Sequence, residues 1–386
     1  MKLREKYIKW MAIILVIAYG VSAFYLYYNQ SITDFSAKPI LFESDLPLHI
    51  SMIIEDGWYY SFTAYAYVLL YYLFGKSTLG IALLLAVATM ATVIITGRLI
   101  EYLSKNKIGK VGAVFLSLMI NFVMPIFVSA VGEFRYVSYQ SPNVWHNSTY
   151  ILMRVFAVMA LLYYFKLEEK YIKGITLKEW IVFALLMVVT TGIKPSFLFV
   201  FSPIVGFFLL KDLIKTKSLK KILIFGASLL PSGIVILWQN AVLFGEETGN
   251  GVIFNPWYTF SIRTAIPKIA IILSALFAIL VVMVCLKELL RDKKYLFIIL
   301  MTGLGFLQAL CLTESGSRSV DGNFLWGYSL CLYFLFVITA IKALIMKNEG
   351  IYKFIKPVLL VVFVAHLACG IYYYIELLQG TSYFMR

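Results

Sequence analysis

The chain has few charged residues and lacks the motifs of common soluble enzymes. Charged residues make up 14% of the 386 residues and hydrophobic residues 61%, whereas soluble domains carry about 25% charged residues. The four cysteines show neither CxxC nor Cys/His spacing, so we expect no disulfide and no zinc site. HExxH, Walker, GxSxG and DxD motifs are also missing, which argues against a metalloprotease, an ATPase and the usual nucleotide-sugar enzymes.

Long apolar runs dominate the sequence instead. A membrane-spanning helix needs about 20 apolar residues, and the basic start of the first run, with no small-residue cleavage site after it, predicts a retained signal anchor. We therefore predict an all-α polytopic membrane protein, with residues 1–386 as one transmembrane domain and no soluble domain. The eleven candidate spans are 9–28, 77–98, 111–130, 149–165, 179–193, 196–210, 222–243, 269–287, 296–312, 326–345 and 357–377.

The net charge of +14 follows the predicted topology and does not indicate a nucleic-acid partner. Six segments that alternate with the spans hold 25 of the 34 Lys and Arg residues. Because basic loops stay in the cytoplasm, we predict a multi-pass protein of the cell membrane, with its N-terminus cytoplasmic and its C-terminus extracytoplasmic. The six basic segments are 1–9, 98–110, 166–178, 211–221, 287–294 and 342–356.

This orientation depends on residues 58–76, "WYYSFTAYAYVLLYYLFGK", which are apolar but rich in interface-seeking Trp and Tyr. If they spanned the membrane, the basic segment 98–110 would lie outside. We predict instead a surface or re-entrant helix, so that residues 29–76 form a first extracytoplasmic loop with juxtamembrane helices. Reporter fusions after Tyr28, Lys76 and Arg386 should then all report an outside location. A cytoplasmic signal at Lys76 would contradict the prediction.

Acidic residues and a histidine follow the first span in "FESDLPLHISMIIEDGWYY", residues 41–59. A helix starting near Ser44 would place Asp45, His49 and Asp56 on one stripe. We expect it to lie in the outer interface with its apolar face in lipid. Its charges either simply face water or include a carboxylate general base assisted by the imidazole.

Other polar residues near predicted membrane boundaries also allow two interpretations. Lys194 in "TGIKPSFLFVFSPI" either snorkels or meets a lipid phosphate. The loop "LTESGSRSVDGNFLWGY" either forms a polar turn or presents Arg318, a planar donor suited to phosphate, between Glu314 and Asp321. Arg154, inside an apolar run, should have an anionic partner or line a wet cavity.

His146 lies in "RYVSYQSPNVWHNSTYILMR", next to Trp145. It is either a sugar-contacting residue or an interface anchor together with Trp145. The "NST" that follows is a glycosylation sequon only in a suitable host. His366, alone in an apolar run, is expected to be structural.

The order of these features resembles the C-type (GT-C) integral membrane glycosyltransferases, such as the aminoarabinose and protein O-mannosyl transferases. "ESDLPLH" is similar to the family's acidic opening loop, and "YYLFGKST" to its tyrosine-rich "LFG" segment. "TTGIKPSFLFVFSPI" is similar to the "TKGP" turn, although Lys-Pro-Ser replaces Lys-Gly-Pro. The resemblance covers about the first 210 residues and continues only as hydropathy, without a large C-terminal soluble domain.

The resemblance implies an inverting transfer of a sugar from a polyprenyl-phosphate carrier to a cell-envelope glycan or lipid acceptor, at a membrane-lipid surface. It also implies that Asp45 is the catalytic base. Alternatives are a lipid-linked polysaccharide polymerase or ligase, and a flippase or transporter. No cofactor is expected, because acidic ligands on one short helix make a poor metal cage. The expected site residues are Asp45, His49 and Glu43 for catalysis; Lys194, Arg318 and Arg154 for the lipid phosphate; and His146, Glu314, Asp321 and Asp56 for the sugar or acceptor.

Overall fold

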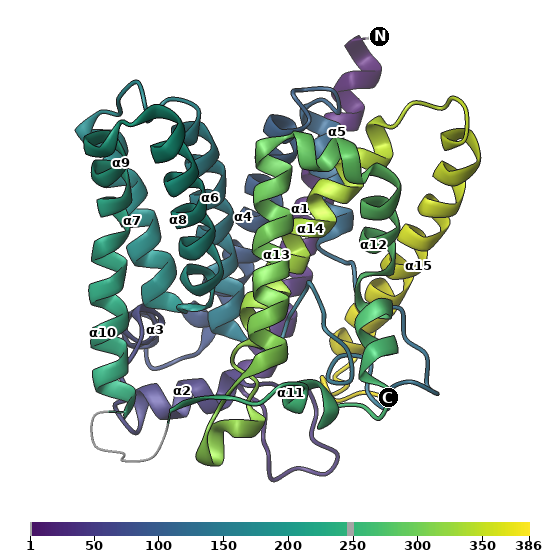
Figure 1. Ribbon diagram of the computed structural model, residues 1–386. Helices are drawn as coiled ribbons and strands as arrows, with labels where there is room; N and C mark the ends of the chain where they lie inside the picture. The colour runs from purple at the N-terminus through teal and green to yellow at the C-terminus, as the bar shows by residue number, and fades with distance from the viewer. Residues whose placement is uncertain (1, 245–250) are drawn as a thin grey trace.

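The protein is a bundle of long helices, seen side by side in Figure 1. The computed structural model describes residues 2–244 and 251–386. Within these residues, nine helical segments are long and apolar enough to cross a membrane, which confirms the all-α polytopic membrane fold. The elements are α1 (Lys2–Ser31), α2 (Leu46–Ile54), α3 (Phe62–Leu73), α4 (Leu79–Leu103), α5 (Lys110–Ile120), α6 (Ser148–Glu168), α7 (Leu177–Ile193), α8 (Ser196–Thr216), α9 (Leu219–Gly226), η1 (Ala227–Leu229), α10 (Leu230–Phe244), β1 (Val252–Phe254), α11 (Tyr258–Ser261), α12 (Pro267–Arg291), α13 (Lys293–Cys311), β2 (Leu312–Glu314), η2 (Gly316–Val320), α14 (Leu325–Ile345) and α15 (Tyr352–Leu378).

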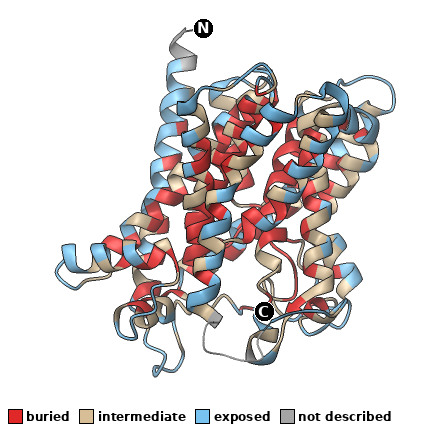
Figure 2. Ribbon diagram, turned by 60° about the vertical axis from the view of Figure 1, so that its left-hand side comes forward, coloured by how far each residue is buried: buried red, intermediate tan, exposed pale blue. Residues whose placement is uncertain are grey.

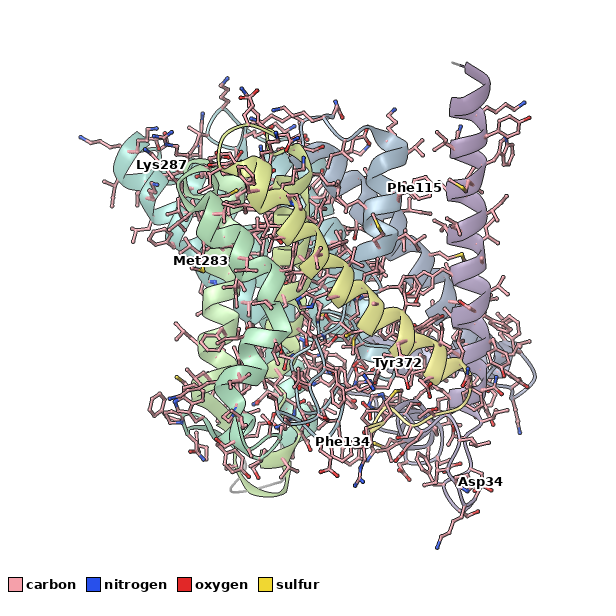
Figure 3. The ribbon with its side chains drawn as sticks, turned by 90° about the vertical axis from the view of Figure 1, so that its right-hand side faces the viewer. Asp34, Phe115, Phe134, Met283, Lys287 and Tyr372 are labelled. Atoms are coloured by element: carbon pink, nitrogen blue, oxygen red, sulfur yellow. The ribbon has the colours of Figure 1, made fainter. Side chains whose placement is uncertain are left out.

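The surface of the bundle is apolar and its interior is tightly filled. Buried residues concentrate on the inward faces of the helices (Figure 2). Met283 of α12 is 70% exposed and Tyr372 of α15 is 47% exposed; both are labelled in Figure 3. Exposed apolar side chains at mid-helix are those of a lipid-facing surface.

Two of the eleven predicted spans, 179–193 and 111–130, are not among the nine helical segments of membrane-spanning length. α7 has 17 residues. Residues 111–130 do not form one helix, because α5 ends at Ile120 and Pro125 follows. The amide of Asn143 donates 2.8 Å hydrogen bonds to the carbonyls of Ile120 and Val123. Non-helical backbone is tolerated at membrane depth only where the protein supplies such partners.

α2 and α3 lie at the end of the bundle opposite the N-terminus, and the C-terminus lies at that same end (Figure 1). α3 has 12 residues, so it is about 18 Å long and shorter than the hydrocarbon core of a bilayer. The expectation that the apolar face of α2 lies in lipid is wrong. Leu46, Ile50 and Ile53 are buried in the protein core, because α1 and α3 pack against α2.

The non-helical segment after α5 packs directly against α15 at Gly370. A Cβ atom at Gly370 would lie 1.5 Å from the carbonyl oxygen of Phe122. Gly370→Ala should therefore lower the apparent melting temperature in detergent by several degrees, because overpacking typically costs about 1–3 kcal/mol. Gly303→Ala in α13 is the matched control, since nothing lies within 4 Å of its Cβ position and alanine favours the helix. Equal melting temperatures of the two variants would contradict this packing.

Candidate functional site

A chain of hydrogen bonds at the start of α6 links Lys194 to Asp45. The ammonium of Lys194 donates to Thr149 Oγ1 at 3.2 Å, and Thr149 donates to Asn147 Oδ1 at 2.9 Å. The amide nitrogen of Asn147 then donates to Asp45 Oδ2 at 2.9 Å. The bonds therefore run from a cation to a carboxylate through two residues at the first turn of α6.

The first residues of α6 can hold these groups because Asn147 is the N-cap of the helix. Asn147 Oδ1 accepts from the backbone N–H of Tyr150 at 3.0 Å, which satisfies one donor that every helix start leaves open. His49 joins the cluster through Nδ1, which lies 3.3 Å from Ser148 Oγ. Asp45 and His49, four residues apart on α2, thus face neighbouring residues of α6.

The local sequence explains how Asp45 and Lys194 come to lie at the start of α6. The side chain of Asp45, at the N-cap position of α2, makes no capping bond, and the N2 residue Pro47 has no N–H to donate. Ser44 Oγ accepts from the backbone N–H of Leu46 at 3.2 Å. The Asp45 carboxylate is therefore available to Asn147. Lys194 ends α7 with extended backbone (φ −158°, ψ 122°), the conformation that a following proline favours.

The C-terminal segment closes over the same cluster. Tyr383 lies close enough to Asp45 for the charge of that carboxylate to influence its pKa, and its ring stacks on His146 with a centroid distance of 4.2 Å and an interplanar angle of 10°. The hydroxyl of Ser382 donates to Glu43. Glu43 therefore lies beside the Asp45 cluster and is held by the end of the chain.

The loop after β2 brings further charges close to Lys194. Arg318 Nε lies 3.1 Å from Glu314 Oε2 and 3.7 Å from Asp321 Oδ2. The charges of Arg318 and Glu314 both influence the pKa of Lys194, so this loop borders the cluster. Asp321 is exposed at its edge.

Two predicted residues do not join the cluster. Asp56 lies beyond the end of α2 and is exposed. Arg154 is 1% exposed, and its Nη1 donates to Asn143 Oδ1 at 2.6 Å. Its guanidinium also lies 5.1 Å from the ring centroid of Tyr333. In place of the expected anionic partner, Arg154 contacts a neutral amide and an aromatic ring. This geometry supports a role in packing the protein interior.

Burial controls the protonation of the cluster. It lowers the pKa of Lys194 to about 8, although the Asp45 carboxylate opposes the shift. It also lowers the pKa of His146 to about 4 and lowers the pKa of His49, with Asp45 again opposing. At neutral pH His146 is uncharged and Lys194 carries its proton. The Lys194 ammonium lies 4.6 Å from the ring centroid of Trp326, a cation–π contact that stabilises the charged form.

Five residues of the cluster were missed from the sequence: Asn147, Ser148, Thr149, Trp326 and Tyr383. A polar residue directly before an apolar helix signals an N-cap, so Asn147 could have been found. Tyr383 had no local signal. Among the described residues, no group of three or more His, Cys, Asp or Glu side chains is arranged to hold a metal ion.

Fold and cluster together define a polytopic helical membrane protein with a polar, charged site at one end of its bundle. No known family model matches the sequence, and no curated protein matches it.

Proposed function

We propose that the protein is a membrane glycosyltransferase that moves a sugar from a polyprenyl-phosphate carrier to a cell-envelope acceptor. One observation carries the proposal: a carboxylate, Asp45, and a half-buried ammonium, Lys194, are joined through Thr149 and Asn147 at the start of α6. Such a pair supplies the two functions that the reaction needs, a base for the acceptor and a cation for the leaving phosphate.

In the proposed reaction, Asp45 takes the proton of the acceptor hydroxyl. The acceptor oxygen attacks the anomeric carbon, and the bond from that carbon to the phosphate oxygen breaks. The configuration at the carbon inverts, and the polyprenyl phosphate leaves with the bonding electrons. Lys194 stabilises the negative charge that grows on this phosphate, the kind of preorganised electrostatic stabilisation that contributes most to many enzymes.

The neighbouring groups fit supporting roles. His49 is half-buried and close enough to Asp45 for the charge of that carboxylate to influence its pKa. It can therefore assist proton removal. The stacked rings of Tyr383 and His146 offer aromatic surface for a sugar. Arg318, Glu314 and Glu43 lie at the border of the cluster, where they can contact the lipid phosphate or the acceptor.

The proposed orientation places the site outside the cell. α2 and the C-terminus lie at the end of the bundle opposite the N-terminus (Figure 1). Most Lys and Arg residues fall in six segments that the predicted topology places on the same side of the membrane as the N-terminus. The positive-inside rule therefore supports a cytoplasmic N-terminus. On the outer face nucleotide sugars are absent, which is consistent with a lipid-linked donor.

A reconstitution assay tests the function. Purified full-length protein in liposomes should form a glycosidic product from a polyprenyl-phosphate sugar and an acceptor, and release polyprenyl phosphate in equal amount. Movement of the lipid-linked sugar across the bilayer without product would instead establish a flippase. Products containing many added sugar units would establish a polymerase.

A further inference from the structure

A cleft of about 600 Å³ opens at the end of the bundle where the chain begins, away from the Asp45 cluster. The C-terminal halves of α4 and α6 and the turn after α4 form its walls. α6 begins at the Asp45 cluster, and 18 residues separate Ser148 from Lys166, so the two sites are about 27 Å apart along the helix. The cleft is lined by Arg98, Glu101, Tyr102, Lys105, Asn106, Leu162 and Lys166.

Positive charge is in excess in this cleft. Its lining contains three cations and one carboxylate. Glu101 pairs with Arg98 at 3.1 Å. Within the part of the chain that the structure describes, Lys105 and Lys166 have no ion-pair partner within 4.0 Å. Two lysines are therefore available to an anion.

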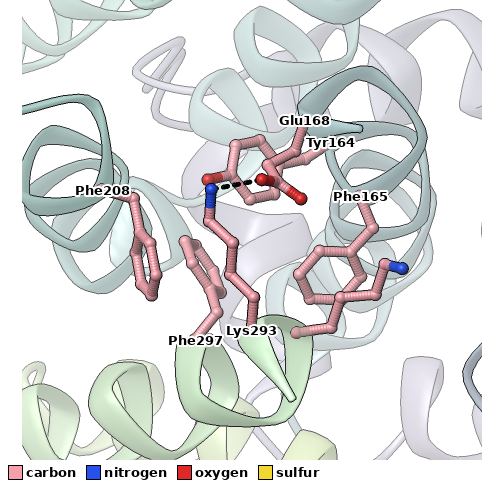
Figure 4. A pocket seen from close by; sticks show the side chains of 7 residues that line it. Tyr164, Phe165, Glu168, Phe208, Lys293 and Phe297 are labelled. Atoms are coloured by element: carbon pink, nitrogen blue, oxygen red, sulfur yellow. Dashed lines mark ion pairs between the residues drawn. The ribbon is translucent and has the colours of Figure 1, made fainter. Parts of the chain in front are cut away.

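The neighbouring lysines, Lys293 and Lys294, differ from Lys105 and Lys166 because carboxylates neutralise their charges. Lys293 points to Glu168 between aromatic rings (Figure 4) and also lies 3.0 Å from Asp212. Lys294 lies 2.6 Å from Glu169. These ion pairs join α13 to the end of α6 and to α8, whereas Lys105 and Lys166 of the cleft are open to a ligand from outside the protein.

Apolar residues precede the cations by one helical turn, toward the middle of α4 and α6. Ile94 precedes Arg98 by four residues and is 49% exposed, and Leu162 precedes Lys166 by four residues and lines the cleft. Residues four apart share one helix face. A soluble anion would not need such apolar surface, but a molecule with a charged head and an acyl chain would cover both parts.

We propose that this cleft binds the phosphate-bearing headgroup of an anionic phospholipid from the adjacent leaflet. The phosphate lies between Lys105 and Lys166, and an acyl chain follows Leu162 and Ile94 toward the bilayer centre. Basic residues at the ends of spanning helices lie at the depth of lipid phosphates, and each one near the surface strengthens binding by about fivefold.

Native mass spectrometry of the full-length protein in detergent tests the proposal, with phosphatidylglycerol and phosphatidylcholine as probes. The double variant Lys105→Gln/Lys166→Gln should bind phosphatidylglycerol about tenfold or more weakly than the unmodified protein. The matched control is Lys215→Gln/Lys220→Gln, which removes two exposed lysines outside the cleft lining and should leave binding unchanged. Phosphatidylcholine should bind weakly to all three proteins.

Three results would overturn the proposal. Equal loss of phosphatidylglycerol binding in both double variants, or no loss in either, would show only general attraction to a basic surface. Inorganic phosphate binding to the unmodified protein as tightly as phosphatidylglycerol would show a site for soluble anions.

Discussion

Asp45→Asn should reduce sugar transfer by about 10²–10⁴-fold, the usual contribution of general-base assistance. Asparagine keeps the size of the side chain and can still hydrogen-bond to Asn147, but it cannot accept the proton of the acceptor. Turnover measured in the liposome assay should therefore fall, while the amount of folded protein and its melting temperature stay close to normal.

Asp56→Asn is the matched control for this experiment. Asp56 belongs to the same acidic segment, but it lies beyond the end of α2 and is exposed, so its replacement should leave turnover nearly unchanged. Near-normal transfer by a well-folded Asp45→Asn protein would remove Asp45 as the base. Equal losses in both variants would point to a general effect of charge at this end of the bundle.

Lys194→Gln should lower the rate of transfer by about 10²–10³-fold, the typical cost of removing one preorganised group that stabilises developing charge. Lys194 is the cation at the end of the hydrogen-bond chain to Asp45. Glutamine can keep the bond to Thr149 but offers no charge to the leaving phosphate. Lys38→Gln, which changes an exposed lysine of the predicted first extracytoplasmic loop, should be nearly silent.

The pH dependence separates the charge of Lys194 from its packing. Burial lowers the pKa of Lys194 to about 8, so the free protein loses this positive charge as the pH rises through about 8. Its kcat/KM should fall over the same range. Lys194→Arg should move the fall to higher pH, because arginine stays protonated there. An unchanged profile in Lys194→Arg would assign the fall to another group.

Much of the fold could be predicted from apolar runs alone. Helices long enough to span a membrane satisfy their own backbone hydrogen bonds, so a run such as that of α4 determines a helix regardless of its neighbours. The same reasoning failed at residues 111–130. There the segment after α5 depends on Asn143 and on the close approach of Gly370, contacts that join distant parts of the chain.

Like the fold, the candidate site could be predicted only in part from the sequence. Asp45, His49 and Lys194 were candidates because charged residues at a membrane boundary are costly and therefore informative. Arg154 was a candidate for the same reason, but its partners are Asn143 and aromatic rings. From the sequence alone, a charged residue in an apolar run could be either a phosphate ligand or a residue that packs in the protein interior.

By itself, the sequence determined the membrane class of the protein, the approximate positions of most spanning helices and the short segments where charge gathers. These properties depend on hydrophobicity and on the order of residues along the chain. Only the tertiary structure decided that α2 covers α1 and α3 with its apolar face, that Tyr383 reaches Asp45, and that Asn147 and Thr149 connect that carboxylate to Lys194. Such contacts depend on how α2, α6, the turn at Lys194 and the chain end pack together, and local sequence does not specify that packing.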